Sequence, residues 1–278
     1  LAYYGDAWPT FSPDGKQIAL FLAKEGPYGD YWLVPAEGGE PRRLTSEKQS
    51  SSGPRWAPDG KRLAFVSARD GVSQIWTGEI NETGTRDLKR VTNLSTGAEG
   101  PVWSPDGKWI GFTSEVYPEC ASDECNQKRA EQAATSKLKA KITDRLLYRQ
   151  WNSWKEGKRS HVFATPANGG ESRDLTPGDY DAPPFSLGGP ADYAFSPDSK
   201  ELAFARNTDR IEAISTNGDI FIVPIAGGEA RRITAENPAN DLSPQYSRDG
   251  RYIAYRAQSK QGFESDRWKL TLYDRKTG

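Results

Sequence analysis

One ten-residue pattern occurs five times along the chain and constrains its fold more than any other feature. Each copy joins an aromatic residue, a tight turn containing aspartate and a short apolar alternation: FSPDGKQIAL, WAPDGKRLAF, WSPDGKWIGF, FSPDSKELAF and YSRDGRYIAY. The turn aspartates are Asp14, Asp59, Asp106, Asp198 and Asp249, which gives steps of 45, 47, 92 and 51 residues. The long step equals one repeat plus an insertion. Internal repeats of this period indicate an array built from one supersecondary unit.

Each repeat predicts four short strands. In the second repeat the strands are expected over 54–59, 61–68, 73–80 and 88–93, and the Pro-Asp-Gly-Lys turn reverses the chain between the first two. A repeat of this length with one four-stranded antiparallel sheet is typical of a β-propeller blade. The 278 residues therefore predict an all-β fold, a β-propeller over 1–278 with five visible blades.

The repeated residues themselves are expected to be structural. The aromatic residue before each turn should pack between neighbouring blades, and the turn aspartate should bond to the turn backbone instead of serving catalysis or metal binding. A second, shorter motif, here called the threonine echo, occurs four times with the sequences RRLT, KRVT, SRDLT and RRIT. Its copies end in Thr45, Thr92, Thr176 and Thr234.

The last repeat has three of its four expected strands. Two alternatives follow: the N-terminal segment 1–4 supplies the fourth strand and closes a five-bladed ring, or the chain is a piece of a larger propeller. An open sheet edge is a liability that native chains normally cover. We therefore expect an incomplete propeller.

Strand parity places the irregular segments together. The Pro-Asp turns share one face, so the loops after the second strand of each blade and the links between blades share the other. These loops are an insertion over 115–160 within blade three, with a helix expected over 126–147, the link 177–190 and the loops 207–218 and 260–266. Function concentrates in long loops on a rigid scaffold, so the loop face should carry the site. The basic excess of the insertion fits either a solvated helix face or an acidic partner, and the solvated face is favoured.

Composition excludes several classes of function. The net charge is -1, which gives no electrostatic motive for binding nucleic acid, and no apolar run is long enough to span a membrane. One histidine and two cysteines argue against a zinc, haem or iron–sulfur site. We expect no metal and no cofactor.

A hydrolytic centre is also missing from these residues. No serine occupies the middle of a G-x-S-x-G elbow, and His161 lies at the start of an expected strand, where it should be structural. Cys120 and Cys125 form a lone C-x4-C pattern. A local disulfide, two unpaired thiols and a metal site remain open, with the disulfide favoured.

The sequence around the insertion carries a family resemblance. The repeats are TolB-like, and LLYRQWNSWKEGKRSH with DLTPGDYDAPPFSLGGP resembles the propeller of bacterial dipeptidyl-peptidase and acylaminoacyl-peptidase-like enzymes of the prolyl oligopeptidase family. The resemblance implies a serine exopeptidase whose propeller caps a C-terminal α/β-hydrolase domain, absent from this chain, that carries the catalytic triad. It also implies export to the periplasm or medium and leaves a homo-oligomer open.

The resulting functional expectation is a propeller that gates and positions peptide N termini for the hydrolase domain, which would release dipeptides or acyl-amino acids. The physical contribution of such a cap is exclusion of folded proteins and orientation of the scissile bond. The alternative is a TolB-like protein-binding propeller with no attached enzyme. Whether these residues are catalytic by themselves is therefore in doubt.

Five residues are candidates for a substrate site on the loop face. Because family exopeptidases use acidic propeller residues for the substrate ammonium, Glu99 and Glu115 are expected to bind it. Tyr117, Arg149 and Trp151 would wall the pocket, with the Arg149 guanidinium holding a carboxylate or carbonyl. In the alternative, Glu99 and Glu115 pair with Arg145 and Arg149 and fasten the insertion.

Overall fold

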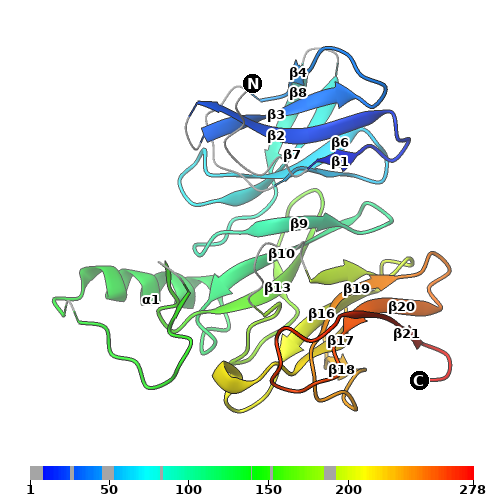
Figure 1. Ribbon diagram of the computed structural model, residues 1–278. Helices are drawn as coiled ribbons and strands as arrows, with labels where there is room; N and C mark the ends of the chain where they lie inside the picture. Colours follow the sequence, from blue (N-terminus) through cyan, green and yellow to red (C-terminus); the bar gives the residue numbers. More distant parts are fainter. Residues whose placement is uncertain are drawn as a thin grey trace. The chain divides into compact units, whose positions relative to one another are not determined.

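The computed structural model describes residues 9–25, 28–45, 53–81, 84–138, 140–150, 153–184 and 192–278. Within these ranges the strands form four four-stranded sheets, one three-stranded sheet and a two-stranded ribbon (Figure 1). The strands of the described sheets pair antiparallel, as β16 does with β17. The predicted all-β propeller fold class is confirmed. The chain forms two compact units, Leu1–Thr113 with Phe163–Arg173, and Ser114–Val162 with Asp174–Gly278.

The first two repeats form two sheets of the first unit. The first sheet holds β1 (Thr10–Phe11), β2 (Gln17–Glu25), β3 (Tyr28–Pro35) and β4 (Arg42–Arg43), and the second holds β5 (Arg55–Trp56), β6 (Arg62–Ser67), β7 (Gln74–Asn81) and β8 (Gly84–Arg90). Buried side chains of both sheets pack into one cluster that includes Phe21, Tyr31, Phe65 and Trp76. Blade packing is therefore apolar, as the alternating strands predict.

The third repeat forms a sheet with the order β14-β13-β10-β9, whose strands are divided between the two units. Its strands are β9 (Glu99–Trp103), β10 (Trp109–Val116), β13 (Arg159–Pro166) and β14 (Arg173–Asp174). The long insertion leaves this sheet after β10 and returns at β13. It contains α1 (Asp123–Thr135) and a ribbon of β11 (Arg149–Gln150) with β12 (Ser153–Trp154).

The last two repeats lie in the second unit. One sheet holds β15 (Tyr193–Phe195), β16 (Glu201–Asn207), β17 (Gly218–Pro224) and β18 (Arg231–Arg232), and the other holds β19 (Asp241–Tyr246), β20 (Tyr252–Ala257) and β21 (Lys269–Asp274). A short 3-10 helix, η1 (Glu212–Ile214), lies in the loop between β16 and β17. Ala203, Ala205, Ile220, Ile222 and Ile253 form the core between these two sheets.

The turn aspartates have the structural role that the repeats predict. In the first repeat Asp14 Oδ1 accepts hydrogen bonds from the Ser12 hydroxyl at 2.6 Å and the Lys16 backbone N–H at 3.1 Å. The same pair of donors serves Asp106, Asp198 and Asp249, and the Lys61 N–H serves Asp59. These carboxylates therefore hold the turns closed.

The aromatic residues before the turns connect neighbouring blades. The indole N–H of Trp56 donates to the Thr10 carbonyl at 3.2 Å, and that of Trp103 donates to the Arg55 carbonyl at 3.1 Å. Tyr246 donates its hydroxyl to Glu201 at 3.0 Å. Phe11 differs, because 61% of it is exposed. The predicted packing between blades is therefore confirmed for Trp56, Trp103 and Tyr246, and Phe195 is buried as expected, with 6% of it exposed.

In each complete blade the threonine of the echo forms hydrogen bonds to the third strand. We call this group of hydrogen-bonded residues the clasp. The threonine hydroxyl accepts the backbone N–H of Tyr31, Ile75, Val162 or Ile220, which lie one to three residues after the start of the third strand. It then donates to the preceding side chain in three blades, namely Asp30, Gln74 and Asp219. In two of these an arginine completes the clasp, because Arg43 pairs with Asp30 and Arg232 pairs with Asp219, each at 2.5 Å.

His161 belongs to the clasp of blade three, in which the acidic and basic residues have exchanged positions. Asp174 stands where the other echoes have arginine, and His161 stands where they have Asp or Gln. The ring lies 2.7 Å from Asp174 Oδ2 through Nδ1 and 2.9 Å from the Gly178 carbonyl through Nε2. Both partners accept hydrogen bonds, so an imidazolium that donates from both nitrogens satisfies them. With 2% of its surface exposed, His161 is the structural residue predicted from its position.

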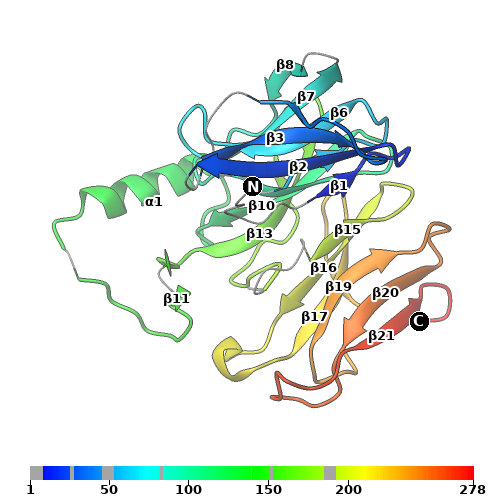
Figure 2. The same cartoon turned by 45° about the horizontal axis from the view of Figure 1, so that its top comes forward.

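The predicted helix over 126–147 is wrong at both ends. Helix α1 spans Asp123–Thr135, and Ser122 caps it by accepting the Cys125 N–H at 3.4 Å. It stops because Thr135 bonds back to the Glu131 carbonyl and the Ser136 hydroxyl accepts the Leu138 N–H, which offers the backbone an alternative to the helix. Two views show α1 and the following segment projecting from the end of β10 (Figure 2).

A disulfide joins Cys120, which lies just before α1, to Cys125, which lies in the first turn of α1.

The described helices are all too short or too polar to cross a bilayer. Within the described ranges, no three His, Cys, Asp or Glu side chains gather as a metal site would require.

Candidate functional site

Glu115 is an unpaired carboxylate near the end of β10, in the second unit. Its side chain is open to solvent, and no described residue makes an ion pair or hydrogen bond with the carboxylate. Burial raises the pKa of Glu115, and the charge of Asp181 raises it further, against the opposing charges of Lys155, Lys158 and His161. Neighbouring protein thus desolvates the carboxylate although its side chain stays accessible to solvent. Such a group is suited to accept a cationic ligand.

The charges around Glu115 are organised by Asp181. This carboxylate accepts hydrogen bonds from Lys155 Nζ, from Arg159 at 3.1 Å and from the Ser160 backbone N–H at 3.0 Å. Lys155 and Asp181 are both largely shielded from solvent, with 12% and 10% of their side chains exposed. The cation of Lys155 is therefore already neutralised by Asp181, and Glu115 keeps its acceptor capacity.

Arg159 is the buried centre of this network. Besides Asp181, it donates to Asp179 at 2.8 Å and to Glu212 at 2.5 Å, and 7% of its side chain is exposed. Burial by itself would lower the pKa of the guanidinium, but the hydrogen bonds to Glu212 and Asp179 outweigh it and raise the pKa. Arg159 thus connects the return of the insertion at β13 to the link after β14 and to the loop that carries η1.

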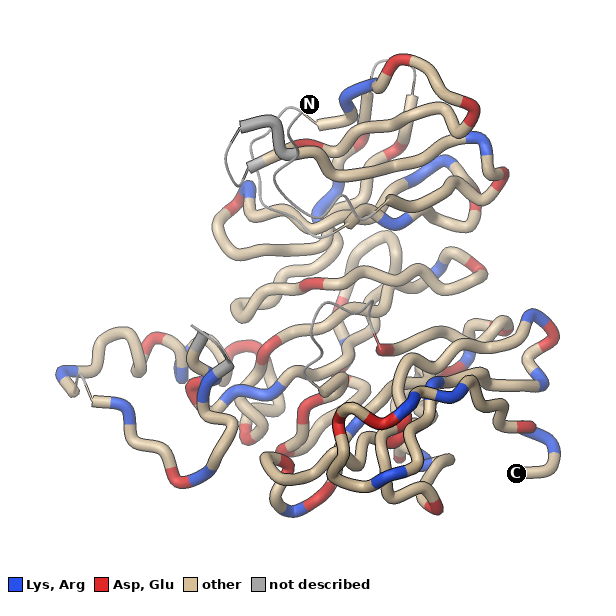
Figure 3. The backbone as a smooth tube through the Cα atoms, in the orientation of Figure 1, with Lys and Arg blue, Asp and Glu red and all other residues tan. Residues whose placement is uncertain are grey.

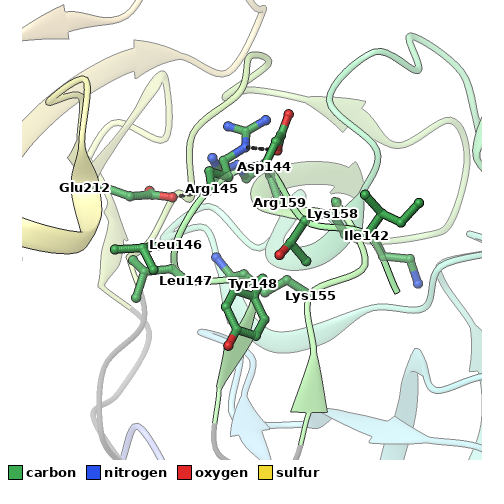
Figure 4. A pocket seen from close by; sticks show the side chains of 12 residues that line it. Ile142, Asp144, Arg145, Leu146, Leu147, Tyr148, Lys155, Lys158, Arg159 and Glu212 are labelled. Atoms are coloured by element: carbon green, nitrogen blue, oxygen red, sulfur yellow. Dashed lines mark hydrogen bonds and ion pairs between the residues drawn. The ribbon is translucent and has the colours of Figure 1, made fainter. Parts of the chain in front are cut away.

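A small pocket opens beside these charges. Its volume is about 130 Å³, and Figure 4 shows Arg145, Arg159 and Glu212 at one side and Tyr148 and Lys155 at another. Lys158 also lines it. Arg145 binds Asp179 at 2.8 Å, so it holds the segment 142–148 against the link after β14.

The alternative that Arg145 pairs with Glu115 is therefore wrong. Basic residues are spread along the insertion, as Figure 3 shows, and several are matched locally, as Lys141 is by Glu156 and Arg129 by Glu119. Arg149 is exposed on β11 and makes no ion pair with any residue that the structure describes.

The remaining predicted site residues have separate environments. Tyr117 is buried, donates its backbone N–H to Asn126 at 2.8 Å and has its ring under Arg129 at 5.2 Å and Lys158 at 5.5 Å. Trp151 lies outside the described residues. Glu99 begins β9 in the first unit, where its side chain is exposed and its pKa is raised by burial.

Of the predicted site residues, Tyr117 has Lys158 Nζ 5.5 Å from its ring, and the charge of the same lysine opposes the rise in the pKa of Glu115. Sequence reasoning missed Lys155, Lys158, Arg159 and Asp181. A signal was available, because the first three lie in WKEGKRSH, the segment that carries the family resemblance. The pairing of Lys155 and Arg159 with Asp181 joins residues more than twenty positions apart, and the separation between Arg159 and Asp181 is 22.

The repeats and their four-stranded antiparallel sheets define a β-propeller fold. The TolB beta propeller domain family matches residues 4–141. Over 97% of its length the chain is 29% identical to dipeptidyl-peptidase 5 of Porphyromonas gingivalis, of which it covers 40%. The chain thus spans about two fifths of the length of the curated relatives it matches first.

Solved structures agree on the fold. The acylaminoacyl peptidase of Pyrococcus horikoshii matches 99% of the chain with a TM-score of 0.65 at 16% identity, and the match covers 38% of that enzyme. The propeller domain of the Trilobed protease of Pyrococcus furiosus matches 99% of the chain with a TM-score of 0.59 at 16% identity, over 70% of that domain. The predicted resemblance is confirmed: this chain is similar to the propellers of dipeptidyl-peptidases and acylaminoacyl peptidases.

Proposed function

We propose that this propeller admits peptides and positions their N termini for a serine exopeptidase domain in the remainder of the protein. Similarity to dipeptidyl-peptidase 5 along nearly the whole chain supports a peptidase-associated propeller. The substrate site is the finer part of the proposal, and one observation supports it: Glu115 is an accessible carboxylate with no ion-pair or hydrogen-bond partner among the residues that the structure describes.

Glu115 would bind the α-ammonium group of the substrate. A hydrogen bond between charged groups contributes about 1.5 to 3 kcal/mol, and more in a desolvated site than in open water. Lys158 stands beside it with three donors and no carboxylate partner among the described residues, so it would hold the first carbonyl of the peptide. This is the role that the sequence predicts for Arg149. Glu99 remains a second predicted ammonium ligand, to be tested separately.

In the full-length enzyme, Glu115→Gln is expected to raise KM for substrates with a free N terminus by roughly ten- to a hundredfold, since each 1.4 kcal/mol is a factor of ten. N-acylated substrates should be unaffected. Because the pKa of Glu115 is raised, mildly acidic pH should weaken binding in the wild type in the same way. Steady-state kinetics on matched free and acetylated chromogenic dipeptides, with Glu99→Gln in parallel, measure both effects.

Glu171→Gln is the matched control, because Glu171 is exposed in the loop between β13 and β14 and should leave KM unchanged. Equal loss on free and acetylated substrates, or a lower Tm with unchanged KM, would assign Glu115 to the scaffold. A full-length protein without peptidase activity would favour the TolB-like binding module instead.

The proposal includes export to the periplasm or medium, where a disulfide persists. A peptide that spans 118–128, isolated without reduction, is expected to weigh about 2 Da less than its reduced form, which mass spectrometry resolves. Its reduction should destabilise the protein by only about 2 kcal/mol, because the bridge closes a short loop. Alkylation of both thiols in native protein would contradict the bridge and weaken the argument for export.

A further inference from the structure

The insertion surrounds a cleft that the proposed ammonium site does not use. Its volume is about 570 Å³, within the range of about 300 to 1,000 Å³ that is typical of small-ligand pockets. One wall is α1, through Arg129, Gln132 and Ala133, and the other walls are the segment after α1 and the strand β12.

Large apolar side chains line the cleft without being covered. Ile142 is 85% exposed, Leu138 is 61% exposed and Trp154 is 46% exposed. The rings of Tyr148 and Trp154 stack at 5.8 Å with an interplanar angle of 24°, which forms a rigid aromatic wall. Apolar groups that converge on a hollow and remain in water mark a binding surface.

The charged residues of the cleft are already paired with one another or with a neighbour. Lys141 binds Glu156 and lies over the Trp154 ring, and Arg129 binds Glu119 at 3.0 Å. The remaining polar lining comes from neutral groups such as Gln132, Ser136 and Thr143. A ligand for this cleft therefore needs no net charge, which argues against a phosphate or a nucleotide.

The lining of the cleft comes within two residues of Glu115 along the chain. Tyr117, two residues further along the chain, lines it, and Lys158 lies 5.5 Å from the Tyr117 ring while its charge acts on Glu115. A peptide whose ammonium reaches Glu115 could thus place a nearby side chain against Tyr117, Tyr148 and Trp154.

We propose that this cleft binds a large apolar side chain, preferably aromatic, near the N terminus of the peptide. The inference rests on the proposed function for the identity of the ligand. Stacking between aromatic side chains stabilises a complex beyond the burial of their surface. The protein should therefore prefer a peptide with Phe over the same peptide with Gly.

Calorimetric titration with four probes tests this preference: Phe-Ala amide, Gly-Ala amide and the N-acetylated form of each. Wild-type protein is expected to bind the Phe member of each pair about tenfold more tightly than the Gly member. Trp154→Ala and Ile142→Ser should remove most of this preference, whereas Trp154→Phe should retain it. Ile214→Ser is the matched control, because Ile214 is equally apolar and 74% exposed but lies in η1, outside the cleft.

The outcomes separate the two proposals. Equal affinity for Phe and Gly probes, or an unchanged preference in Trp154→Ala and Ile142→Ser, would overturn the apolar pocket. Equal affinity for free and acetylated probes with the Phe preference intact would overturn the ammonium site alone. If the variants change sedimentation but not probe affinity, the apolar wall contacts a second copy of the chain and the pocket is likewise overturned.

Discussion

Replacing Arg159 with methionine is expected to lower the free energy of unfolding by about 3 to 5 kcal/mol. The guanidinium is buried and bonds to Asp179, Asp181 and Glu212. Methionine has a similar length and no charge, so it fills the space while leaving Glu212 without its donor and Asp181 with one cation fewer. Uncompensated charges in a shielded site are more costly than the loss of the ion pairs themselves.

Urea denaturation at pH 7 measures the effect, and Arg145→Met provides the control. Arg145 binds the same Asp179 at 2.8 Å, but 56% of its side chain is exposed. An exposed pair of this kind contributes about 0 to 1 kcal/mol. Similar losses in the two variants would contradict the view that burial gives Arg159 its importance.

The Arg159 variant should also affect the site. Because Arg159 and Lys155 share Asp181, the loss of Arg159 leaves Lys155 as the remaining side-chain cation on that carboxylate. The negative charge of Asp181 would then act more strongly on Glu115, and the pKa of Glu115 should rise further. The stability of the network and the affinity for an ammonium ligand are therefore linked.

The blades could be predicted from the sequence because their information is local. The turn aspartate bonds to residues two positions away, and the strands alternate along one repeat. In the second repeat the strands predicted over 61–68 and 73–80 are found as β6 and β7. Local turn chemistry and alternation are the two signals that a single sequence carries well.

The threonine of each clasp could be recognised in the sequence as part of a repeated motif, but its structural role could not be predicted. The threonine of each echo reaches a backbone group 14 to 17 residues earlier, as Thr176 reaches Val162 and Thr92 reaches Ile75. Only the pairing of strands brings these residues together. In blade three, Asp174 takes the place of the arginine and His161 takes the place of the aspartate found in other clasps. Comparing the clasps in space explains these two replacements.

The candidate site could be predicted only in part, because several of its contacts join residues that are far apart in the sequence. Glu115 follows from strand parity, because the exit of a second strand must reach the loop face. Arg159 contacts Glu212 across 53 residues, and no spacing in the sequence indicates that contact. The helix over 126–147 failed because composition favours a helix there, while the side chains of Thr135 and Ser136 bond to the backbone and end it.

A second large effect is expected from Asp241→Asn, which should stabilise the protein at neutral pH. Asp241 is fully buried in β19, and its Oδ2 has no hydrogen-bond donor among the described residues. Burial raises its pKa to about 6, and the nearby charge of Asp219 raises it too, although Asn237, Thr234 and Arg232 favour the ionised form. An amide keeps the bond that Asn237 donates to Oδ1 at 2.8 Å and removes the charge.

The direction of the pH dependence follows from the two states of the chain. The unfolded chain releases the Asp241 proton near its ordinary pKa of 3.8, whereas the folded protein keeps it until about pH 6. Ionisation therefore destabilises the wild type progressively between about pH 4 and pH 6. The interval between the two pKa values corresponds to at most about 3 kcal/mol, which the variant should regain above pH 6.

Urea denaturation of wild type and Asp241→Asn from pH 3.5 to pH 8 measures this difference, which should be near zero below pH 4 and reach its plateau above pH 6. Asp249→Asn in the same blade is the control with the opposite sign. The Ser247 hydroxyl and the Arg251 backbone N–H lower the pKa of Asp249, so its loss should destabilise the protein fully above about pH 4 and progressively less as the pH falls below that. A difference for Asp241→Asn that is constant across this range would show that the substitution acts through packing, and that the carboxyl group of Asp241 titrates alike in the folded and unfolded chain.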